Sequence, residues 1–192
     1  MLQWLYENNV EVLNTISLRY LKEDYDISLL IFRWREIRMN RIEILRQYID
    51  NILLNMSDTE ERRCAYVHLY GVAQSCALIA LKRGENIELA TMAGMLHDIY
   101  SYAKMDTKDH AHKGAALSKE ILTSLQITNE YETKTICDAI YTHSEKGLVH
   151  PNFNEILIDA DVLQHCLYNP MFEIMPHEKN RYEKLKIEFG IA

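Results

Sequence analysis

Turn-forming residues are scarce in this chain, which holds only 6 Gly and 3 Pro in 192 residues. A β-rich fold of this length would need turn residues at most of its chain reversals, so the scarcity favours helices. The stretch Ser57-Asp58-Thr59-Glu60 matches a capping box and predicts the start of a helix. That helix should run to about Arg83 and end at Gly84, which adopts a left-handed cap without steric cost. We therefore predict an all-α fold, a compact helical bundle.

Further start and stop signals predict the remaining helices and the domain organisation. We expect helices from Asn86 to His97-Asp98, from about Asp109 to about Leu125, from the capping box at Asn129–Glu132 to His143, and from Pro151 through EILIDADVLQHC. Before them, the sequence predicts two or three helices with turns near Asn8-Asn9 and around Asp24–Asp26. The expected division is an N-terminal helical extension over 1–56, the main domain over 57–175, and a C-terminal helical tail over 176–192 that packs on the same domain.

The distribution of charged and apolar residues limits the classes of protein to which the chain can belong. The formal net charge is −7, which disfavours binding to long nucleic acids because it provides little attraction to phosphate backbones. The N-terminus lacks the basic start and apolar block of a signal peptide. Residues 64–81 contain no Asp, Glu, Lys or Arg, but His68, Gln74 and Ser75 interrupt them. We interpret them as a buried core helix and not as a membrane span.

Cysteine usage favours a cytoplasmic protein. The four cysteines are scattered and form no CxxC pair, so we expect reduced, buried thiols without a disulfide: Cys64, Cys76, Cys137 and Cys166. An arginine-rich stretch comes before the first capping box and contains Arg33, Arg35, Arg38, Arg41 and Arg46. We interpret it as a solvated helix face with acidic partners, although an anion-attracting surface would have the same composition.

Several ionisable residues lie on otherwise apolar helix faces. The segment AGMLHDIY ends a small, apolar run on the doublet His97-Asp98. His68 shares a face with Val72 and Ile79, and the same spacing rule points His110, His143 and Asp161 inward. A single inward histidine is more often a hydrogen-bonded core residue than a metal ligand. Six such residues on separate elements would each need a partner, whereas a shared divalent centre satisfies all of them together.

The chemistry of these side chains narrows the choice of metal. Mixed imidazole and carboxylate ligands suit Fe, Mn, Co, Ni or Zn better than Ca or Mg. Because the sequence has no cysteine set at ligand spacing, a structural zinc site is disfavoured. We therefore expect one or two divalent transition-metal ions.

The order of these residues resembles the HD superfamily of metal-dependent phosphohydrolases. His68, then the doublet His97-Asp98, then Asp161 match its pattern, and His110 and His143 resemble the subset with two metals. The segments HAHKGA, AIYTHS and EILIDADVL are similar to the family's helices that carry the later ligands. The resemblance covers about residues 60 to 170, so the N-terminal extension and the C-terminal tail lie outside it.

The resemblance implies a role for each matching residue. His68, His97, Asp98 and Asp161 would hold the first metal, and Asp98 would bridge to a second metal held by His110 and His143. His112 competes with His110, but the spacing to Gly114-Ala115 favours His110. Asp159 competes with Asp161, and the alanine directly before Asp161 favours the latter. Asp98 would also orient the attacking water.

One departure from the family concerns phosphate binding. Many two-metal relatives carry a lysine three residues after the HD aspartate, where this chain has Ser101. The nearest basic side chain is Lys104, which we take as a candidate catalytic residue that replaces it. The other interpretation is a solvated surface lysine, with the phosphate held by other groups.

The expected function is hydrolysis of a phosphate ester or anhydride in a small molecule, with nucleotides as the leading substrate class. No long nucleic acid and no membrane is expected as a partner, and homo-oligomerisation is left open. One alternative keeps the two-metal site but uses two irons to activate oxygen and cleave a C–C or C–P bond. Another is a non-catalytic ligand-binding or interaction module, in which the N-terminal extension binds a partner.

Overall fold

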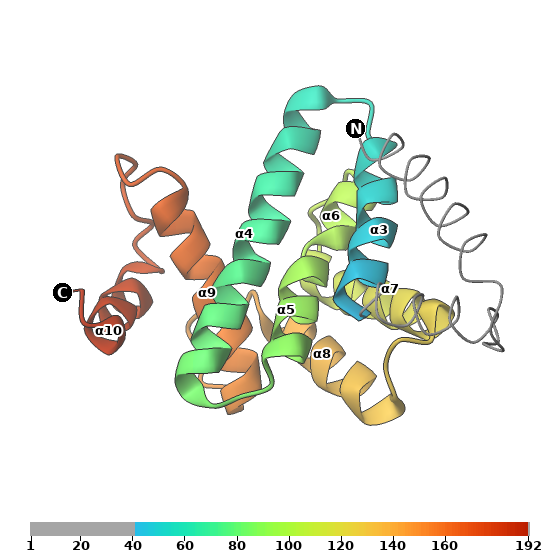
Figure 1. Ribbon diagram of the computed structural model, residues 1–192. Coiled ribbons are helices and arrows are strands. Elements are labelled where there is room, and N and C mark those ends of the chain that lie inside the picture. Colours follow the sequence, from blue (N-terminus) through green and yellow to red (C-terminus); the bar gives the residue numbers. More distant parts are fainter. Residues whose placement is uncertain (1–40, 192) are drawn as a thin grey trace, which may run out of the picture. The chain divides into compact units, whose positions relative to one another are not determined.

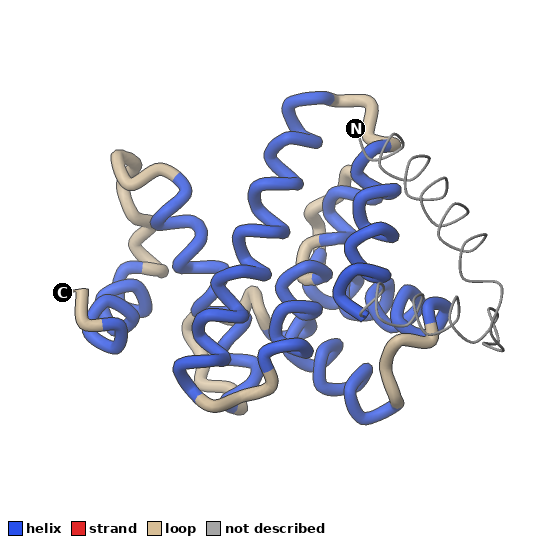
Figure 2. The backbone as a smooth tube through the Cα atoms, viewed as in Figure 1, coloured by secondary structure: helices blue, strands red, loops and turns tan. Residues whose placement is uncertain are grey.

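The computed structural model describes residues 41–191, and every regular element among them is a helix (Figures 1 and 2). The all-α prediction is therefore confirmed for this part of the chain. The predicted turns near Asn8-Asn9 and Asp24–Asp26, and the first three arginines of the arginine-rich stretch, lie outside the described residues. The helices are α3 (Arg41–Leu54), α4 (Thr59–Arg83), α5 (Ile87–Leu96), α6 (Ile99–Lys104), α7 (His110–Leu125), α8 (Glu130–Thr142), α9 (Asn152–Tyr168) and α10 (Lys179–Phe189).

The two ends of α4 follow the local sequence closely. Its N-cap is Asp58, whose side chain accepts hydrogen bonds from the backbone N–H groups of Glu60 and Glu61. The expected capping box would have placed the cap at Ser57, so the start is corrected by one residue. Asp58 is preferred over Ser57 as the N-cap because its carboxylate accepts hydrogen bonds from two of the free N–H groups of the first turn. The helix ends at Gly84, which is left-handed with φ 72° as predicted.

Caps also set the ends of the following helices. The side chain of Asn86 accepts a hydrogen bond from the Leu89 N–H at the start of α5, and the predicted capping box between Asn129 and Glu132 is present at the start of α8. Pro151 lies at the N-cap of α9, one position before the first turn expected for it. The short helix α6 was not predicted as a separate element. It follows Asp98 directly and ends at Met105, which takes a left-handed conformation.

Helix α4 forms the centre of the described fold. It packs against α5 on one side and against α9 on the other (Figure 1). The contact with α5 is so close that a Cβ on Gly94 would lie 2.6 Å from the Cα of Ala73. Since α4 carries His68 and α5 ends at the His97-Asp98 doublet, this close contact brings the two parts of the predicted site together.

Helix α4 also has the length and apolar composition of a membrane span. A single helix of this kind is weak evidence for membrane insertion, because a core helix of a soluble protein meets the same criteria. In the structure, Leu69, Val72, Cys76 and Ile79 of α4 are fully buried.

Helix α3 lies within the predicted N-terminal extension and contributes to the same core. Its residues Leu45, Ile49 and Leu53 are fully buried in the main hydrophobic cluster. Arg41 forms ion pairs with Glu88 of α5 and with Glu132 of α8. This arginine therefore has the acidic partners that the sequence led us to expect.

All four cysteines are free thiols, as predicted, but they are not all buried. Cys76 and Cys166 are buried and Cys137 is partly buried, whereas Cys64 is exposed. Cys64 was expected to be buried because it lies four residues before His68, on the same face of the predicted helix. That expectation was wrong because the first turns of α4, where Cys64 lies, are largely solvent-exposed.

Candidate metal centre

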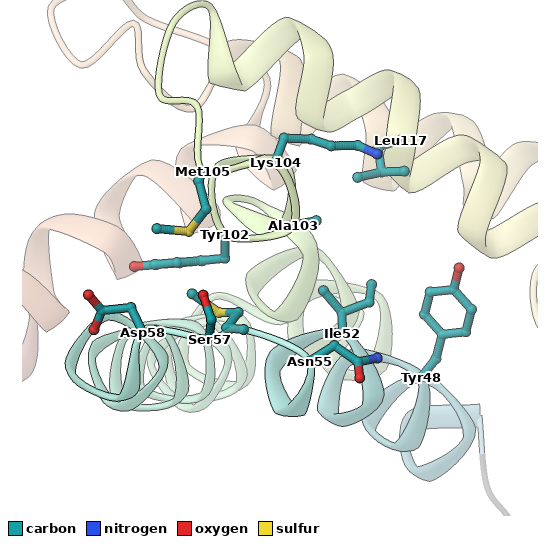
Figure 3. Close-up of a pocket in the computed structure, with 11 residues that line it drawn as sticks. Tyr48, Ile52, Asn55, Ser57, Asp58, Tyr102, Ala103, Lys104, Met105 and Leu117 are labelled. Atoms are coloured by element: carbon teal, nitrogen blue, oxygen red, sulfur yellow. The ribbon is translucent and has the colours of Figure 1, made fainter.

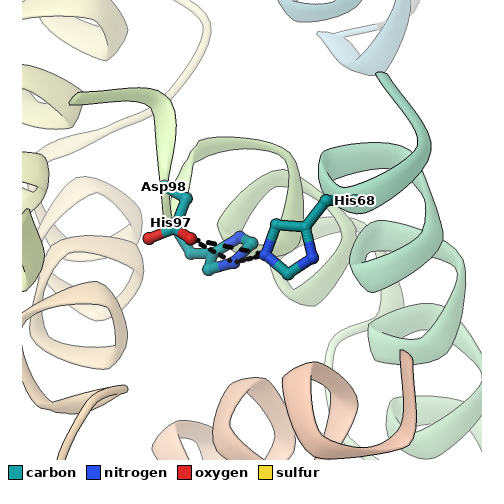
Figure 4. A group of neighbouring side chains, drawn as sticks. All are labelled: His68, His97 and Asp98. Carbon is teal, nitrogen blue, oxygen red and sulfur yellow. Dashed lines mark hydrogen bonds and ion pairs between the residues drawn. The ribbon is translucent and has the colours of Figure 1, made fainter. Parts of the chain in front are cut away.

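The first group of candidate ligands joins α4 to the end of α5. His68 projects from α4, and His97 and Asp98 follow the last residue of α5, with the three side chains facing one another (Figure 4). The Nε2 atoms of His68 and His97 are 3.0 Å apart. Asp98 Oδ2 lies 3.3 Å from Nε2 of His68 and 3.6 Å from Nε2 of His97. Three ligand atoms from two helices therefore converge on one point.

Asp161 of α9 completes this first group from a third helix. Its Oδ1 lies 3.6 Å from Nε2 of His68 and 3.9 Å from Nε2 of His97. Its other oxygen, Oδ2, pairs with the ammonium group of Lys146 at 2.8 Å. Asp161 is therefore held on one side by a lysine and turns its free oxygen toward the two imidazoles.

A second group forms around the other oxygen of Asp98. The Nε2 atoms of His110, at the start of α7, and of His143, at the C-cap of α8, each lie 3.4 Å from Asp98 Oδ1. These two nitrogens are 3.2 Å apart. Since Oδ2 faces the first group and Oδ1 the second, Asp98 has the geometry of a bridging carboxylate.

The tautomers of the four histidines follow from their outer hydrogen bonds. Nδ1 of His97, His110 and His143 faces the carbonyl oxygens of Gly94, Thr107 and Ile140, at 2.8, 3.2 and 2.6 Å. Nδ1 of His68 faces Gln164 Oε1 at 2.9 Å. Each of these oxygens can only accept, so Nδ1 carries a proton, and Nε2 faces the centre with a lone pair whenever the ring is neutral. Metal-binding histidines show the same pattern.

When both rings of a pair are neutral, their facing Nε2 lone pairs repel one another unless a cation lies between them. Two carboxylate oxygens in the centre, Asp98 Oδ1 and Asp161 Oδ1, are also buried and lack any hydrogen-bond partner. Ligands about 2.1 Å from a transition metal are separated by roughly 3.0 to 3.4 Å in octahedral or tetrahedral sites. The spacings of 3.0 and 3.2 Å between the paired imidazoles fall in this range. The residues present therefore fit divalent transition-metal ions.

The electrostatics of the centre favour deprotonated carboxylates. Burial raises the pKa of Asp98, but the neighbouring His97, His143 and His68 outweigh it and hold the pKa well below its usual value. Burial likewise opposes ionisation of Asp161, and Lys146 and the histidines lower its pKa overall. Burial also lowers the pKa of His97 to about 4, so this imidazole stays neutral at physiological pH. Neutral imidazoles and ionised carboxylates are the forms that bind metal.

The two rival ligand candidates lie outside these groups. His112 is exposed, stacks on Tyr141 with ring centroids 4.1 Å apart, and pairs with Asp109. Asp159 forms ion pairs with Arg83 and Arg181, which tie α9 to α4 and α10. Neither residue belongs to a potential metal-ligating group in the described part of the chain. As metal ligands, the geometry favours His110 over His112 and Asp161 over Asp159, which is the choice that the sequence spacing also indicated.

Lys104 lies at the C-terminal end of α6, on the wall of a hollow of about 470 Å³ (Figure 3). The hollow is also lined by Tyr48, Asp58, Tyr102 and Leu117. Among the described residues, no hydrogen bond or ion pair joins Lys104 to any of the six candidate ligands. The ring of Tyr102, however, meets the ring of His68 edge-on with centroids 6.5 Å apart, so one side chain borders both the hollow and the metal centre.

Three residues that surround Asp161 were not predicted from the sequence. Lys146 comes from the α8–α9 loop, His165 lies one turn after Asp161 on α9, and the carboxylate of Glu178 is buried against both. The i, i+4 spacing of Asp161 and His165 was a usable signal, since it places the two side chains on one helix face. Lys146 and Glu178 lie outside regular helices, where no periodicity indicates the direction of a side chain.

Comparison with known proteins identifies relatives of this chain. The sequence model of the HD domain family matches residues 65–166 of the chain. Ribonuclease Y 1 of Levilactobacillus brevis is 25% identical over 123 residues, which are 64% of this chain but only 22% of the relative. The chain therefore corresponds to about a fifth of that protein. A crystal structure of a predicted HD superfamily hydrolase from an uncultured Thermotogales bacterium is 21% identical, with a TM-score of 0.48, covering 86% of this chain and 95% of that one.

Proposed function

The chain belongs to the HD domain family, and we propose that it is a metal-dependent phosphohydrolase of small molecules, with nucleotides as the first substrate class to test. The observation that carries this proposal is the pair of His/Asp groups that share Asp98. We propose that His68, His97, Asp98 and Asp161 hold a first divalent cation, and that Asp98, His110 and His143 hold a second. Fe, Mn, Co, Ni and Zn all suit this ligand set.

Cations bound at these residues would lower the pKa of coordinated water and polarise the oxygens of a phosphoryl group. The protein contributes fixed positions, because each imidazole is held at Nδ1 and Asp161 is held by Lys146. The side chains of His97 and His143 are 0% and 3% exposed, while those of Asp98 and His110 are 21% and 30% exposed. Substrate would therefore approach from the side of Asp98 and His110.

Charge supports an anionic substrate. Two divalent cations carry more positive charge than Asp98 and Asp161 can neutralise, and Lys146 is already paired with Glu178. An occupied centre would therefore attract the phosphoryl group of a small molecule, although the chain as a whole has a net charge of −7. The hollow that Tyr102 shares with the centre would accommodate the remainder of such a substrate, with Lys104 on its wall as a cationic contact in addition to the metal ions.

The test combines metal analysis with an assay of phosphate release. Protein purified without chelator should contain a transition metal and release phosphate from one or more members of a nucleotide panel, and chelator should abolish the release. His110→Ala should lower the rate at least 100-fold, since even residues that support a metal ligand contribute about 10–100-fold. His112→Ala is the matched control, being two residues away on the same helix, and should retain activity within about threefold.

Four outcomes would contradict the proposal. Metal-loaded protein that releases no phosphate from any small molecule would contradict the reaction. Cleavage of RNA alone would support the activity named for the relative from Levilactobacillus brevis instead. A requirement for oxygen together with bound iron would favour the oxygenase alternative. Equal loss of activity in the two histidine variants would contradict the ligand assignment.

A further inference from the structure

His165 is a fifth histidine at the metal centre, and it does not belong to the six-residue pattern. Its Nε2 lies 3.3 Å from Asp161 Oδ1, the buried oxygen that has no hydrogen-bond partner. Its ring stacks on that of His68, with an interplanar angle of 13° and centroids 5.2 Å apart. His68, Asp161 and His165 offer ligand atoms that all lie within 4.8 Å of one another. At 42% exposure, the side chain of His165 borders solvent.

The outer hydrogen bond of His165 matches those of the four histidines described above. Its Nδ1 lies 2.9 Å from Glu178 Oε1. A carboxylate only accepts hydrogen bonds, so the Nδ1–H of His165 donates to it, and Nε2 is left as the ring atom that faces Asp161. A carboxylate that orients a histidine in this way is typical of metal-binding imidazoles.

Glu178 is itself firmly held. Its side chain is only 2% exposed and forms an ion pair with Lys146, which also binds Asp161. Glu178 lies at the N-cap of α10, twelve residues beyond the end of the region that matches the HD family at residue 166. The segment before α10 therefore supplies a buried carboxylate whose contacts lead back to the centre.

We propose that His165 is a further ligand of the first divalent cation, placed on the Asp161 side of the centre and oriented by Glu178. The first site would then present three imidazoles and two carboxylates, from His68, His97, His165, Asp98 and Asp161. This set favours Co, Ni, Zn or Fe over Mg or Ca, because imidazole is a poor ligand for the harder cations. The inference depends on the metal site of the proposed function but not on its substrate.

A competing arrangement makes the opposite prediction for cation affinity. A doubly protonated His165 could pair with Asp161 and Glu178 as a cation and neutralise part of their charge. Removing such a positive group would make the centre more negative and would strengthen cation binding. Removing a ligand would weaken it. The direction of the change therefore separates the two roles.

The experiment measures Co²⁺ binding to chelator-treated full-length protein, by calorimetry and by visible absorption, for wild type and three variants. His165→Ala removes the whole ring. His165→Asn keeps a side-chain donor for Glu178 but lacks Nε2, so it tests the ligand atom with less disturbance of the fold. His177→Ala is the control, since His177 lies 3.9 Å from Glu178 and its side chain is 58% exposed.

Both His165 variants should bind Co²⁺ at least 10-fold more weakly and change the visible spectrum of the bound ion, whereas His177→Ala should behave as wild type. Unchanged or tighter binding with an unchanged spectrum would overturn the inference. Wild-type protein that binds no Co²⁺ would overturn both this inference and the proposed function. If wild-type protein binds Co²⁺ and the His165 variants bind it more weakly, but the wild-type protein hydrolyses no substrate, the inference is supported and only the proposed function is refuted.

Discussion

Replacing Gly94 with alanine tests how the packing of α4 against α5 supports the metal centre. The new Cβ would lie 2.6 Å from Ala73 Cα, 2.8 Å from Ala73 N and 3.0 Å from Cys76 Sγ. Carbon atoms in favourable contact are about 3.5–4.0 Å apart, so the two helices must separate by about 1 Å. Two of the three close atoms belong to the backbone and cannot rotate away.

The expected loss of stability follows from these distances. Overpacking a core costs about 1–3 kcal/mol, and a contact with backbone belongs at the upper end of that range. Alanine in place of glycine inside a helix returns at most about 1 kcal/mol. The net loss should be about 2 kcal/mol, which for a protein of this size lowers the melting temperature by roughly 4–8 °C.

The same displacement should weaken metal binding. His68 and His97 lie on opposite sides of the α4–α5 contact, with Nε2 atoms 3.0 Å apart. Moving them apart by about 1 Å would exceed the roughly 3.4 Å that ligands of one tetrahedral ion span. Gly94→Ala should therefore reduce Co²⁺ affinity as well as stability.

Thermal unfolding of chelator-treated protein and Co²⁺ calorimetry measure the two effects. Gly147→Ala is the matched control, because a Cβ there would meet nothing within 4 Å. A Gly94→Ala protein that melts at or above the wild-type temperature and binds Co²⁺ normally would refute the reasoning.

Three further predictions concern the centre itself. Co²⁺ at 100 times its dissociation constant should stabilise the chelator-treated protein by about 2.7 kcal/mol, measured by urea unfolding, and no stabilisation would mean no site in the folded state. Burial lowers the pKa of His68 and His143, but Asp98 outweighs it and raises both, so Co²⁺ binding near pH 7 should release protons. Calorimetry in buffers of different ionisation heat checks this, and a buffer-independent heat would contradict it. Burial lowers the pKa of His97 to about 4, so between about pH 6.5 and 4 the unfolded chain takes up a proton that the folded chain refuses. Over that pH interval, metal-free His97→Gln protein should therefore lose less stability than metal-free wild-type protein. Urea unfolding measured as a function of pH checks this.

The helices could be predicted from the sequence because their signals are local. Asn86, Gly84 and the capping box at Asn129 each act on backbone groups within one turn, so their effect can be read without knowledge of the fold. The short helix α6 escaped prediction because it has six residues and its N-cap, Asp98, makes no side-chain cap hydrogen bond. The side chain of Asp98 is instead turned toward four histidines.

The candidate ligands could be predicted to the extent that they lie on amphipathic helices. His68 and Asp161 occur among apolar residues at helical spacing, which indicates an inward direction. Lys146 and Glu178 gave no such signal, since one lies in a loop and the other in a strongly charged segment that reads as solvated surface. Their burial depends on how α10 packs beside α9, and that packing is a property of the tertiary structure.

The unpaired oxygens of Asp98 and Asp161 connect the stability of the fold to the proposed chemistry. An unsatisfied buried polar atom costs about 1–3 kcal/mol, and more when it is charged. Lys146 compensates Oδ2 of Asp161, but Oδ1 of Asp161 and Oδ1 of Asp98 have no hydrogen-bond partner in the described structure. A bound cation would remove both costs together, so the carboxylate oxygens that are costly to bury without metal are the ones that would give the centre its affinity for metal.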